Sequence, residues 1–352
     1  MPQTSLPPAT SSTPLQNPRN AGAIWTLLLL APFIAEVLSG STRLSFIFVF
    51  VPEVMVWGCG ALLCRELVRR WRAGAVSLLL LGLALSIAEE FVIQQTSLAP
   101  LPFPGVNAAY GRLWGVNWVY FLFMLGFESV WVVLVPVQVT ELFFPQRRDQ
   151  PWLRKRGLLA TCVIFLVGCR IAWYGWTQQA LKRLNAPAYR VPLSAIAFGI
   201  GAILLLIGLA WLFRTVGRAA SSSSVQSMPV RSISVWIGAI AAFIFGGTWF
   251  MLIGFVFAPH PPTQAWISVA SGVAWALLGL MLFTRFAAQA NWSDTHRWAL
   301  CFGAALGCMV PSDISSAGWS RLDLIAKYVF QLIALLGFLL LGSRVRGTKP
   351  RA

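Results

Sequence analysis

Long apolar runs recur along the chain from Ala21 to Leu341, with only short polar stretches between them. An α-helix needs about 20 mainly apolar residues to cross a bilayer. We place such spans near 21–40, 44–64, 75–95, 118–142, 157–176, 193–213, 233–258, 265–284, 298–312 and 323–343. The pattern therefore predicts an all-α fold, a polytopic membrane helix bundle of about ten transmembrane helices.

Composition agrees with lipid as the solvent. Hydrophobic residues make up 57% of the chain and charged residues 11%, and the mean hydropathy is +0.72. This balance excludes an ordinary soluble protein. We expect one membrane domain at 21–343, a disordered tail at 1–20 and a basic tail at 344–352. Four serines, Ser221–Ser224, predict a flexible linker between a charged five-span half at 21–176 and an apolar one at 193–343.

The formal charge of +16 is open to two interpretations, nucleic-acid binding or membrane topology. Lys and Arg fall in short clusters between the apolar runs, which is typical of cytoplasmic membrane loops. Nineteen of them lie in the tails and the alternate loops at 65–72, 147–156, 214–231 and 285–297, against seven on the opposite side. We expect both termini in the cytoplasm, membrane lipid as partner, no nucleic acid, and a bacterial cytoplasmic membrane as the location.

Six ionisable residues lie inside the predicted spans of the first half. They are Glu36, Glu53, Glu89, Glu90, Glu128 and Arg170. Each such residue costs roughly 2.5–3.5 kcal/mol on insertion scales, so a cluster needs a compensating reason. Their depths predict a polar cavity that opens outward. The alternative is a structural network that joins helices, with Arg170 as the counter-charge.

The adjacent glutamates of the third span are the strongest candidates for chemistry. Ser86, Glu90 and Gln94 are spaced four apart and share one helical face, which offers a row of hydrogen-bonding groups. Crowded carboxylates in a low dielectric cannot all stay ionised, so at least one is expected to hold a proton as a general base or proton carrier. We predict that role for Glu90, and predict that Glu89 is the structural partner of Arg170.

At this pair the sequence resembles the CAAX protease and bacteriocin-processing family of intramembrane glutamate proteases. That family carries two glutamates followed after three residues by arginine, then Phe-x-x-x-His on the next span, and a later His-x-x-x-Asn. Here Glu89 and Glu90 match the pair, Gln94 stands in the arginine slot, and Met124 and Glu128 stand in the Phe and His slots. The resemblance covers about residues 75–145. It implies hydrolysis by a glutamate-activated water, or a non-catalytic relative.

Other chemistries lack their residues. The cysteines all lie in apolar segments with no CxxC pair, the only histidines are His260 and His296, in or near loops, and no HExxH occurs. We therefore expect no metal and no cofactor.

Three function classes stay open: a glutamate hydrolase or its relative, a proton- or cation-coupled transporter, and a structural or partner-binding protein. The substrate is an unknown peptide, lipid or small ion.

Two smaller features carry structural expectations. The outer loop from Thr96 to Val116 is rich in Pro and Gly and is either a lid or a rigid connector, and we favour the connector. Gly303 and Gly307, four apart in the ninth span, predict close packing against another helix.

Overall fold

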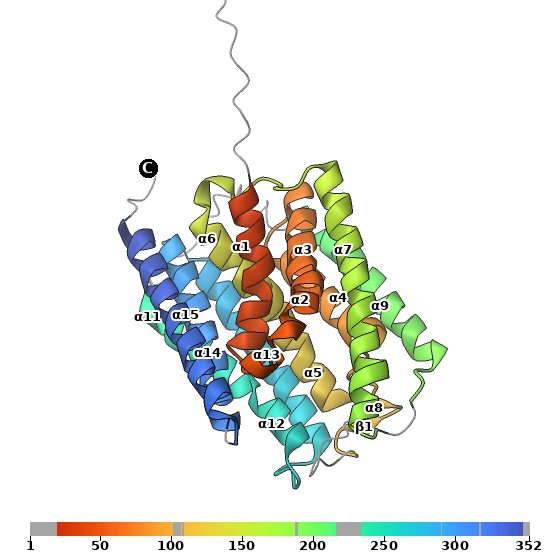
Figure 1. The fold of residues 1–352 in the computed structure, drawn as a ribbon. Helices are drawn as coiled ribbons and strands as arrows, with labels where there is room; N and C mark the ends of the chain where they lie inside the picture. Colours follow the sequence, from red (N-terminus) through yellow and green to blue (C-terminus); the bar gives the residue numbers. More distant parts are fainter. Residues whose placement is uncertain are drawn as a thin grey trace, which may run out of the picture.

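The computed structural model describes residues 20–100, 107, 109–186, 189–215, 234–289, 291–316 and 318–347. Over these residues the chain forms a helix bundle with one small β-hairpin at its edge (Figure 1). Most of the tails predicted at 1–20 and 344–352, the serine linker and part of the outer loop lie outside the described residues, but 344–347 continue the last helix and are not a separate tail. The all-α polytopic bundle predicted from the sequence is confirmed.

The first half contains both ordinary and irregular helices. The α-helices are α1 (Ala21–Pro32), α2 (Phe50–Glu53), α3 (Cys59–Arg70), α4 (Ala75–Ala88), α5 (Trp118–Phe127), α6 (Val135–Phe143), α7 (Lys155–Trp173) and α8 (Leu181–Arg183). Between them lie π-helical segments, η1 (Phe33–Val37), η3 (Val54–Gly58), η4 (Glu89–Ile93), η5 (Glu128–Leu134) and η7 (Tyr174–Ala180). Short 3-10 turns occur at η2 (Leu44–Val49) and η6 (Pro145–Arg147), and β1 (Arg112–Leu113) pairs antiparallel with β2 (Val116–Asn117).

The second half is more regular. It consists of α9 (Leu193–Leu212), the short turn η8 (Phe213–Thr215), α11 (Val235–Trp249), α12 (Met251–Phe257), α13 (Ala265–Ala287), α14 (Asp294–Ser315) and α15 (Arg321–Gly347). α14 covers the predicted span at 298–312 and packs against α11 and α15. Within the described residues, eight helical stretches are long and apolar enough to cross a membrane, and Ala21–Val37 is a shorter apolar one.

The arrangement of the helix ends agrees with the predicted topology. α1 begins and α15 ends at the same end of the bundle, and β1 lies at the opposite end (Figure 1). The basic cluster that closes α3 lies at the first of these ends, as does the start of α7. Which end faces the cytoplasm follows from the positive-inside rule and stays a prediction.

The glutamate-bearing helices occupy the middle of the bundle. The most apolar part of Ala75–Ile93 is 67% buried and that of Trp118–Phe143 is 56% buried, against 11% for Lys155–Arg183 and for Leu193–Leu212. α7 and α9 therefore present most of their surface outward, where lipid would surround them. A carboxylate on η4 or η5, the π-helical continuations of α4 and α5, consequently meets other helices and not lipid.

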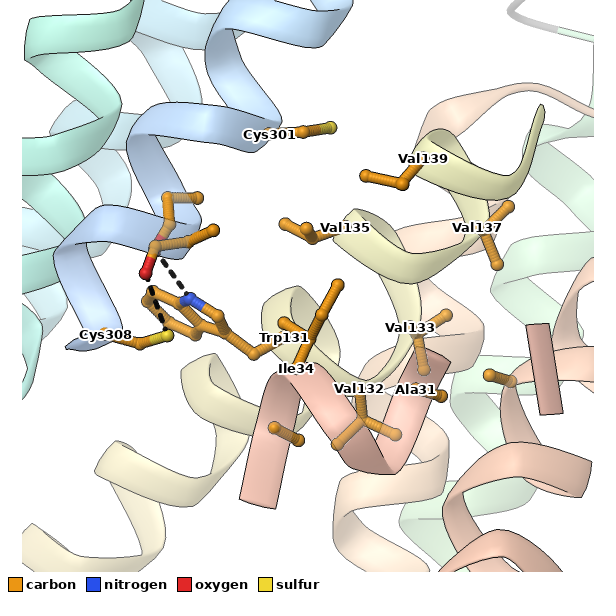
Figure 2. Close-up of a cluster of buried hydrophobic side chains, with 14 of the residues drawn as sticks. Ala31, Ile34, Trp131, Val132, Val133, Val135, Val137, Val139, Cys301 and Cys308 are labelled. Atoms are coloured by element: carbon orange, nitrogen blue, oxygen red, sulfur yellow. Dashed lines mark hydrogen bonds between the residues drawn. The ribbon is translucent and has the colours of Figure 1, made fainter. Parts of the chain in front are cut away.

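The two halves share one core. Trp131 of η5 donates from Nε1 to the backbone oxygen of Ala304 on α14 at 2.9 Å, and Figure 2 shows Trp131 reaching toward the helix that carries Cys301 and Cys308. Val132, Val133 and Ile34 pack beside it in the same apolar cluster. This packing holds η5, and with it Glu128, at a fixed position between the halves.

Glycine permits the tight contact between α11 and α14. A Cβ on Gly303 would lie 2.1 Å from the backbone oxygen of Ala239, and one on Gly307 would lie 2.9 Å from the backbone oxygen of Phe243. Any side chain at these positions would force the helices apart. The close packing predicted for Gly303 and Gly307 is confirmed.

A buried ion-pair network closes the basic end of the first half. Arg65 is fully buried, lies 3.1 Å from Glu141 and 3.2 Å from Glu66, and stacks 3.3 Å from the ring centroid of Trp152. Arg69 also pairs with Glu141, at 2.6 Å. These contacts join α3 to α6 and to the loop before α7. The sequence alone predicts Arg65 only as one of the cytoplasmic loop charges at 65–72.

Candidate functional site: a buried carboxylate cluster

Each intramembrane glutamate lies in a π-helical segment or directly beside one. Glu36 lies within η1, Glu53 immediately precedes η3, Glu89 and Glu90 open η4, and Glu128 opens η5. A π-helical turn hydrogen-bonds from i to i+5 in place of i+4, and such turns occur frequently at functional sites. The backbone irregularity therefore coincides with the candidate residues on four separate spans.

The structure brings all five glutamates into one buried group, the carboxylate cluster. Their exposed fractions are 9% for Glu36, 6% for Glu53, 2% for Glu89 and 0% for Glu90 and Glu128. Glu36 interacts through charge with Glu53 and Glu89, and Glu128 interacts with Glu90, Glu89 and Glu36. Five acids from separate parts of the sequence thus share one interior site.

Close helix packing produces this convergence. A Cβ on Gly82 of α4 would lie 3.1 Å from the Cα of Ser129, so α4 approaches η5 about two turns before Glu89. A Cβ on Gly58 would lie 2.3 Å from the backbone oxygen of Leu28, so η3 approaches α1 equally closely. These two contacts bring the elements that carry Glu89, Glu128, Glu53 and Glu36 together.

Glu90 is saturated with hydrogen bonds. The Thr96 hydroxyl donates to it at 2.8 Å, and Ser97 donates through both its backbone nitrogen, at 2.8 Å, and its hydroxyl. Ser97 is itself held by the hairpin, since its backbone oxygen accepts from the Asn117 nitrogen at 2.8 Å. Glu90 therefore fixes the turn that ends the third span. Arg112 donates to the backbone oxygens of Leu98 and Ala99 in the same turn.

The carboxylates of Glu89 and Glu128 differ from that of Glu90 in their hydrogen bonding. Within the described part of the chain, neither oxygen of either carboxylate has a hydrogen-bond partner. Glu53 is intermediate, because one oxygen accepts from the Thr42 hydroxyl and the other has no partner. Leaving a buried polar group unpaired is costly, and a buried charge costs more. The four oxygens of Glu89 and Glu128 are therefore among the buried polar atoms of the described residues that have no partner, as is the second oxygen of Glu53.

The hydrogen bonds to Glu90 come from Thr96 and Ser97 and not from Ser86 or Gln94, the residues predicted to share its face. The Ser86 side chain is fully buried beside the carboxylate of Glu128, and its hydroxyl reaches no partner with hydrogen-bonding geometry. Gln94 is half-buried just after η4, where its backbone nitrogen bonds back to the Glu89 oxygen at 2.9 Å. The π-helical turn changes the rotation between these residues, which a regular 3.6-residue period does not anticipate.

The predicted pairing of Arg170 with a glutamate is wrong. Arg170 is exposed on α7, and its guanidinium lies 4.4 Å from the ring centroid of Trp173 and 5.7 Å from that of Tyr174. No ion pair among the described residues includes it. The guanidinium stacks on these aromatic rings, which gives it cation–π contacts in place of an ion pair. The carboxylate cluster consequently lacks the counter-charge assigned to it from the sequence.

The cluster is also more enclosed than the outward-opening cavity predicted from depth alone. None of its glutamates is more than 9% exposed. A small hollow in the described structure lies elsewhere, lined by Ser234, Gly238, Phe286, Gln289, His296 and neighbouring residues. The geometry therefore corresponds to a closed site.

Several residues of the site escaped the sequence interpretation. Thr96 and Ser97 follow the third span and were counted only as loop, and Thr42 lies in the turn after Glu36. Tyr120 interacts with Glu90, Glu128 and Glu36. In the sequence it cannot be distinguished from the other aromatic residues of its apolar span. Hydroxyl side chains six and seven residues after a buried glutamate can indicate a hydrogen bond to it, because a chain that turns at the end of a helix can fold back against that helix.

Comparison with known proteins gives one match. A model described as an uncharacterized membrane protein family matches residues 26–179. This segment contains all five glutamates of the cluster, so the similarity covers the half that holds the candidate site. No curated protein and no solved structure matches the chain. The resemblance to the CAAX protease family is not confirmed by the family comparison. What is established is a multi-pass integral membrane protein.

Proposed function

We propose that this chain is a proton-coupled membrane transporter in which Glu89 and Glu128 bind the proton. The observation that carries the proposal is their four unpartnered carboxylate oxygens, enclosed among other acids at the centre of the bundle. A carboxyl group in that environment is more stable when it holds a proton. Ionisable groups facing a bundle interior are typical of proton relays and transport pathways.

A hydrolase is less well supported by the same residues. Activation of water by a glutamate needs a further group that stabilises the developing oxyanion or protonates the leaving group. Gln94, in the arginine slot of the protease resemblance, is only half-buried, and Glu128 adds another acid where that family has histidine. Arg170 faces away from the cluster. Among the described residues, the site offers proton acceptors without a group that would stabilise the oxyanion or protonate the leaving group.

A purely structural network is also less well supported. Buried charges that stabilise a fold are paired, as Arg65, Glu66 and Glu141 are at the basic end. In the described residues, Glu89 and Glu128 have no such partner. A network that only glues helices together would have no reason to retain four unsatisfied carboxylate oxygens at its centre.

The first test measures proton binding directly. Infrared difference spectra of the purified protein, recorded on stepping the pH, should show carboxyl bands that decrease in Glu89→Gln and in Glu128→Gln. The matched control is Asp149→Asn, since Asp149 is exposed in the loop before α7. The control should retain the bands of the parent. Spectra in which neither glutamine variant changes a band would refute proton binding by this pair.

The second test measures transport. Full-length protein in liposomes with an internal pH dye should move protons when a panel of amino acids, sugars, amines and salts is presented across the membrane. Glu89→Gln and Glu128→Gln should abolish the coupled proton movement, and Asp149→Asn should not. Proton movement that persists in both glutamine variants would contradict the assignment.

A further inference from the structure

We infer that the exposed face of α7 docks against a transmembrane helix of another membrane protein, and that Arg170 forms an ion pair with an Asp or Glu inside that helix. This contact is independent of the proposed proton role, because Arg170 lies on the exposed side of α7 and stacks on Trp173. It assigns a partner to an intramembrane charge that has no counter-charge in the described residues of this chain.

The Arg170 guanidinium lies at the depth of lipid hydrocarbon. The helical stretch Lys155–Arg183 has 29 residues, about 43 Å at 1.5 Å per residue, so it extends about 6 Å beyond each side of a hydrocarbon core of about 30 Å when centred in the bilayer. The guanidinium stacks beside Trp173 and Tyr174. That level is about 14 Å before the end of the stretch at Arg183, and therefore about 8 Å inside the hydrocarbon.

This chain supplies no acid to Arg170. All eleven acidic residues of the sequence lie in the described part of the chain, and the ion pairs found there do not include Arg170. Its contacts with Trp173 and Tyr174 are with ring faces, which leaves the guanidinium N–H groups without an oxygen acceptor among the described residues. Charged side chains inside a span are costly and normally pair with another group. An exposed, unpaired arginine at this depth therefore indicates a contact with another molecule.

The surface around Arg170 has the form of a helix-packing face. Its members recur at intervals of four, three and four residues: Leu159, Val163, Leu166 and Arg170. The three apolar ones are each more than half exposed. This spacing follows one side of a helix and is the seam along which two helices pack at a shallow angle. Another side of α7 is already occupied, since a Cβ on Gly168 would lie 2.6 Å from the Cβ of Met55.

A second copy of this chain does not fit the face. Two copies packed through α7 would bring their Arg170 side chains together, and like charges repel strongly in a low dielectric. The five glutamates of the carboxylate cluster are at most 9% exposed, so they are inaccessible to another copy. Asp313, which is exposed on α14, already pairs with Lys327.

Charge and depth together define the partner. The phosphate of a phospholipid lies in the headgroup region, outside the hydrocarbon in which the Arg170 guanidinium lies. An Asp or Glu inside a partner's span meets the guanidinium at its own depth. The planar guanidinium can then donate two parallel hydrogen bonds to that carboxylate. The face therefore fits an apolar transmembrane helix with one acid near its middle.

The test measures association with synthetic transmembrane peptides in phosphatidylcholine liposomes. Full-length protein with a fluorescent protein fused to its C-terminus is the energy donor. Lysine-flanked leucine–alanine peptides of about 20 residues, labelled with an acceptor dye, are the probes. One peptide carries Glu at its centre, and two others carry Leu or Lys there. The Glu peptide should bind about tenfold more tightly than the Leu peptide, the effect of one charge-assisted contact, and the Lys peptide should bind no better than the Leu peptide.

Variants of Arg170 separate charge from general helix packing. Arg170→Leu should bind the Glu and Leu peptides equally. Arg170→Lys should keep a smaller preference for the Glu peptide, because an ammonium group keeps the charge but lacks the planar fork that binds both carboxylate oxygens. Arg183→Leu is the matched control, since Arg183 is exposed at the end of the same helical stretch. It should retain the full preference of the parent.

A bulky substitution tests the face itself. Leu166 on α7 and Leu204 on α9 are both 64% exposed. Leu166→Trp should weaken binding of the Glu peptide at least about fivefold, because the larger ring would hold the two helices apart. Leu204→Trp makes the same change on a different helix and should bind as the parent does.

Three results would overturn the inference. Equal binding of the Glu peptide to the parent and to Arg170→Leu would show that the arginine does not recognise the acid. Energy transfer between two labelled copies of the parent that is lost in Arg170→Leu would assign the face to a second copy. Native mass spectrometry in which the parent retains phosphatidylglycerol and Arg170→Leu loses it, without any preference for the Glu peptide, would assign the guanidinium to a lipid headgroup. None of these results changes the infrared carboxyl bands that test the proposed proton role.

Discussion

Glu90 and Ser97 form a hydrogen-bonded contact whose strength is open to measurement at the level of one residue. Ser97 is fully buried and donates to Glu90 through its hydroxyl as well as its backbone nitrogen. Ser97→Ala removes one donor from a buried carboxyl and should lower the free energy of unfolding by about 1–3 kcal/mol. Thermal or denaturant unfolding in detergent measures the loss.

Ser343→Ala is the matched control for this substitution. Ser343 is exposed on α15, and its hydroxyl donates only to the Leu340 oxygen of its own helix. The control should change stability by less than about 0.5 kcal/mol, as is usual for surface sites. Equal, small effects of the two substitutions would mean that Ser97 does not support Glu90.

The glutamates themselves were predictable from the sequence, and their relative roles were not. Glu36, Glu53, Glu89, Glu90 and Glu128 all occur in apolar runs, and each lies buried in the structure. The division of roles within the adjacent pair depends on a turn that returns Thr96 and Ser97 to Glu90. The functional roles of Glu89 and Glu90 stay predictions, with the geometry favouring Glu89 as the group free to exchange a proton.

At the scale of elements, close contacts between helices occur at glycines that can be recognised in the sequence. Gly303→Ala places a Cβ 2.1 Å from the Ala239 backbone oxygen, and backbone cannot move aside as a flexible side chain can. We expect a loss of about 1–3 kcal/mol in the free energy of unfolding, the usual cost of overpacking. Unfolding of the purified variant, followed by the fluorescence of its tryptophans, provides the measurement.

Gly337→Ala makes the same chemical change in α15, where a Cβ would meet nothing within 4 Å. Alanine favours a helix over glycine by about 0.5–1 kcal/mol, so this control should be neutral or stabilising. If both substitutions destabilised the protein equally, the effect would belong to helical glycine in general and not to the contact between α11 and α14.

The π-helical segments are the part of the element structure that periodicity did not predict. A regular 3.6-residue period placed Ser86, Glu90 and Gln94 on one face. The i to i+5 bonding that begins at Glu89 changes the rotation after that residue. Hydropathy gives the positions of the spans because lipid selects apolar residues. It carries no information about which turn widens, since that depends on packing between helices.

At the scale of the whole molecule, span placement was largely predictable and the position of Arg170 was not. The predicted run at 298–312 forms the helix α14, but α14 is not among the eight stretches long and apolar enough to cross a membrane, so its role as a span stays a prediction. Arg170 was paired with a glutamate because their depths agree, but depth leaves the direction around the helix axis open. α7 lies at the periphery with little of its surface buried, and so its charged residue points outward.

The orientation of the bundle in the membrane is the last prediction. Trp114 is 85% exposed in the hairpin turn at one end, and Asp149 is exposed in the loop at the opposite, basic end. The positive-inside rule places the basic end in the cytoplasm. In a background with the six native cysteines replaced, Trp114→Cys should react with an impermeant maleimide on intact cells. Asp149→Cys should react only after permeabilisation.

The possible labelling results separate an error in the fold from an error in the membrane orientation. Reaction of both positions from the same side would contradict the bundle itself, since α5 and α6 lie between them in the sequence and the two loops lie at opposite ends. The reversed pattern would keep the fold and invert the membrane orientation, against a count of nineteen basic residues to seven. In the predicted orientation the buried Arg65 network lies at the cytoplasmic end, and the turn beside Glu90 lies toward the outer end, where Ser97 bonds to Asn117 of the hairpin.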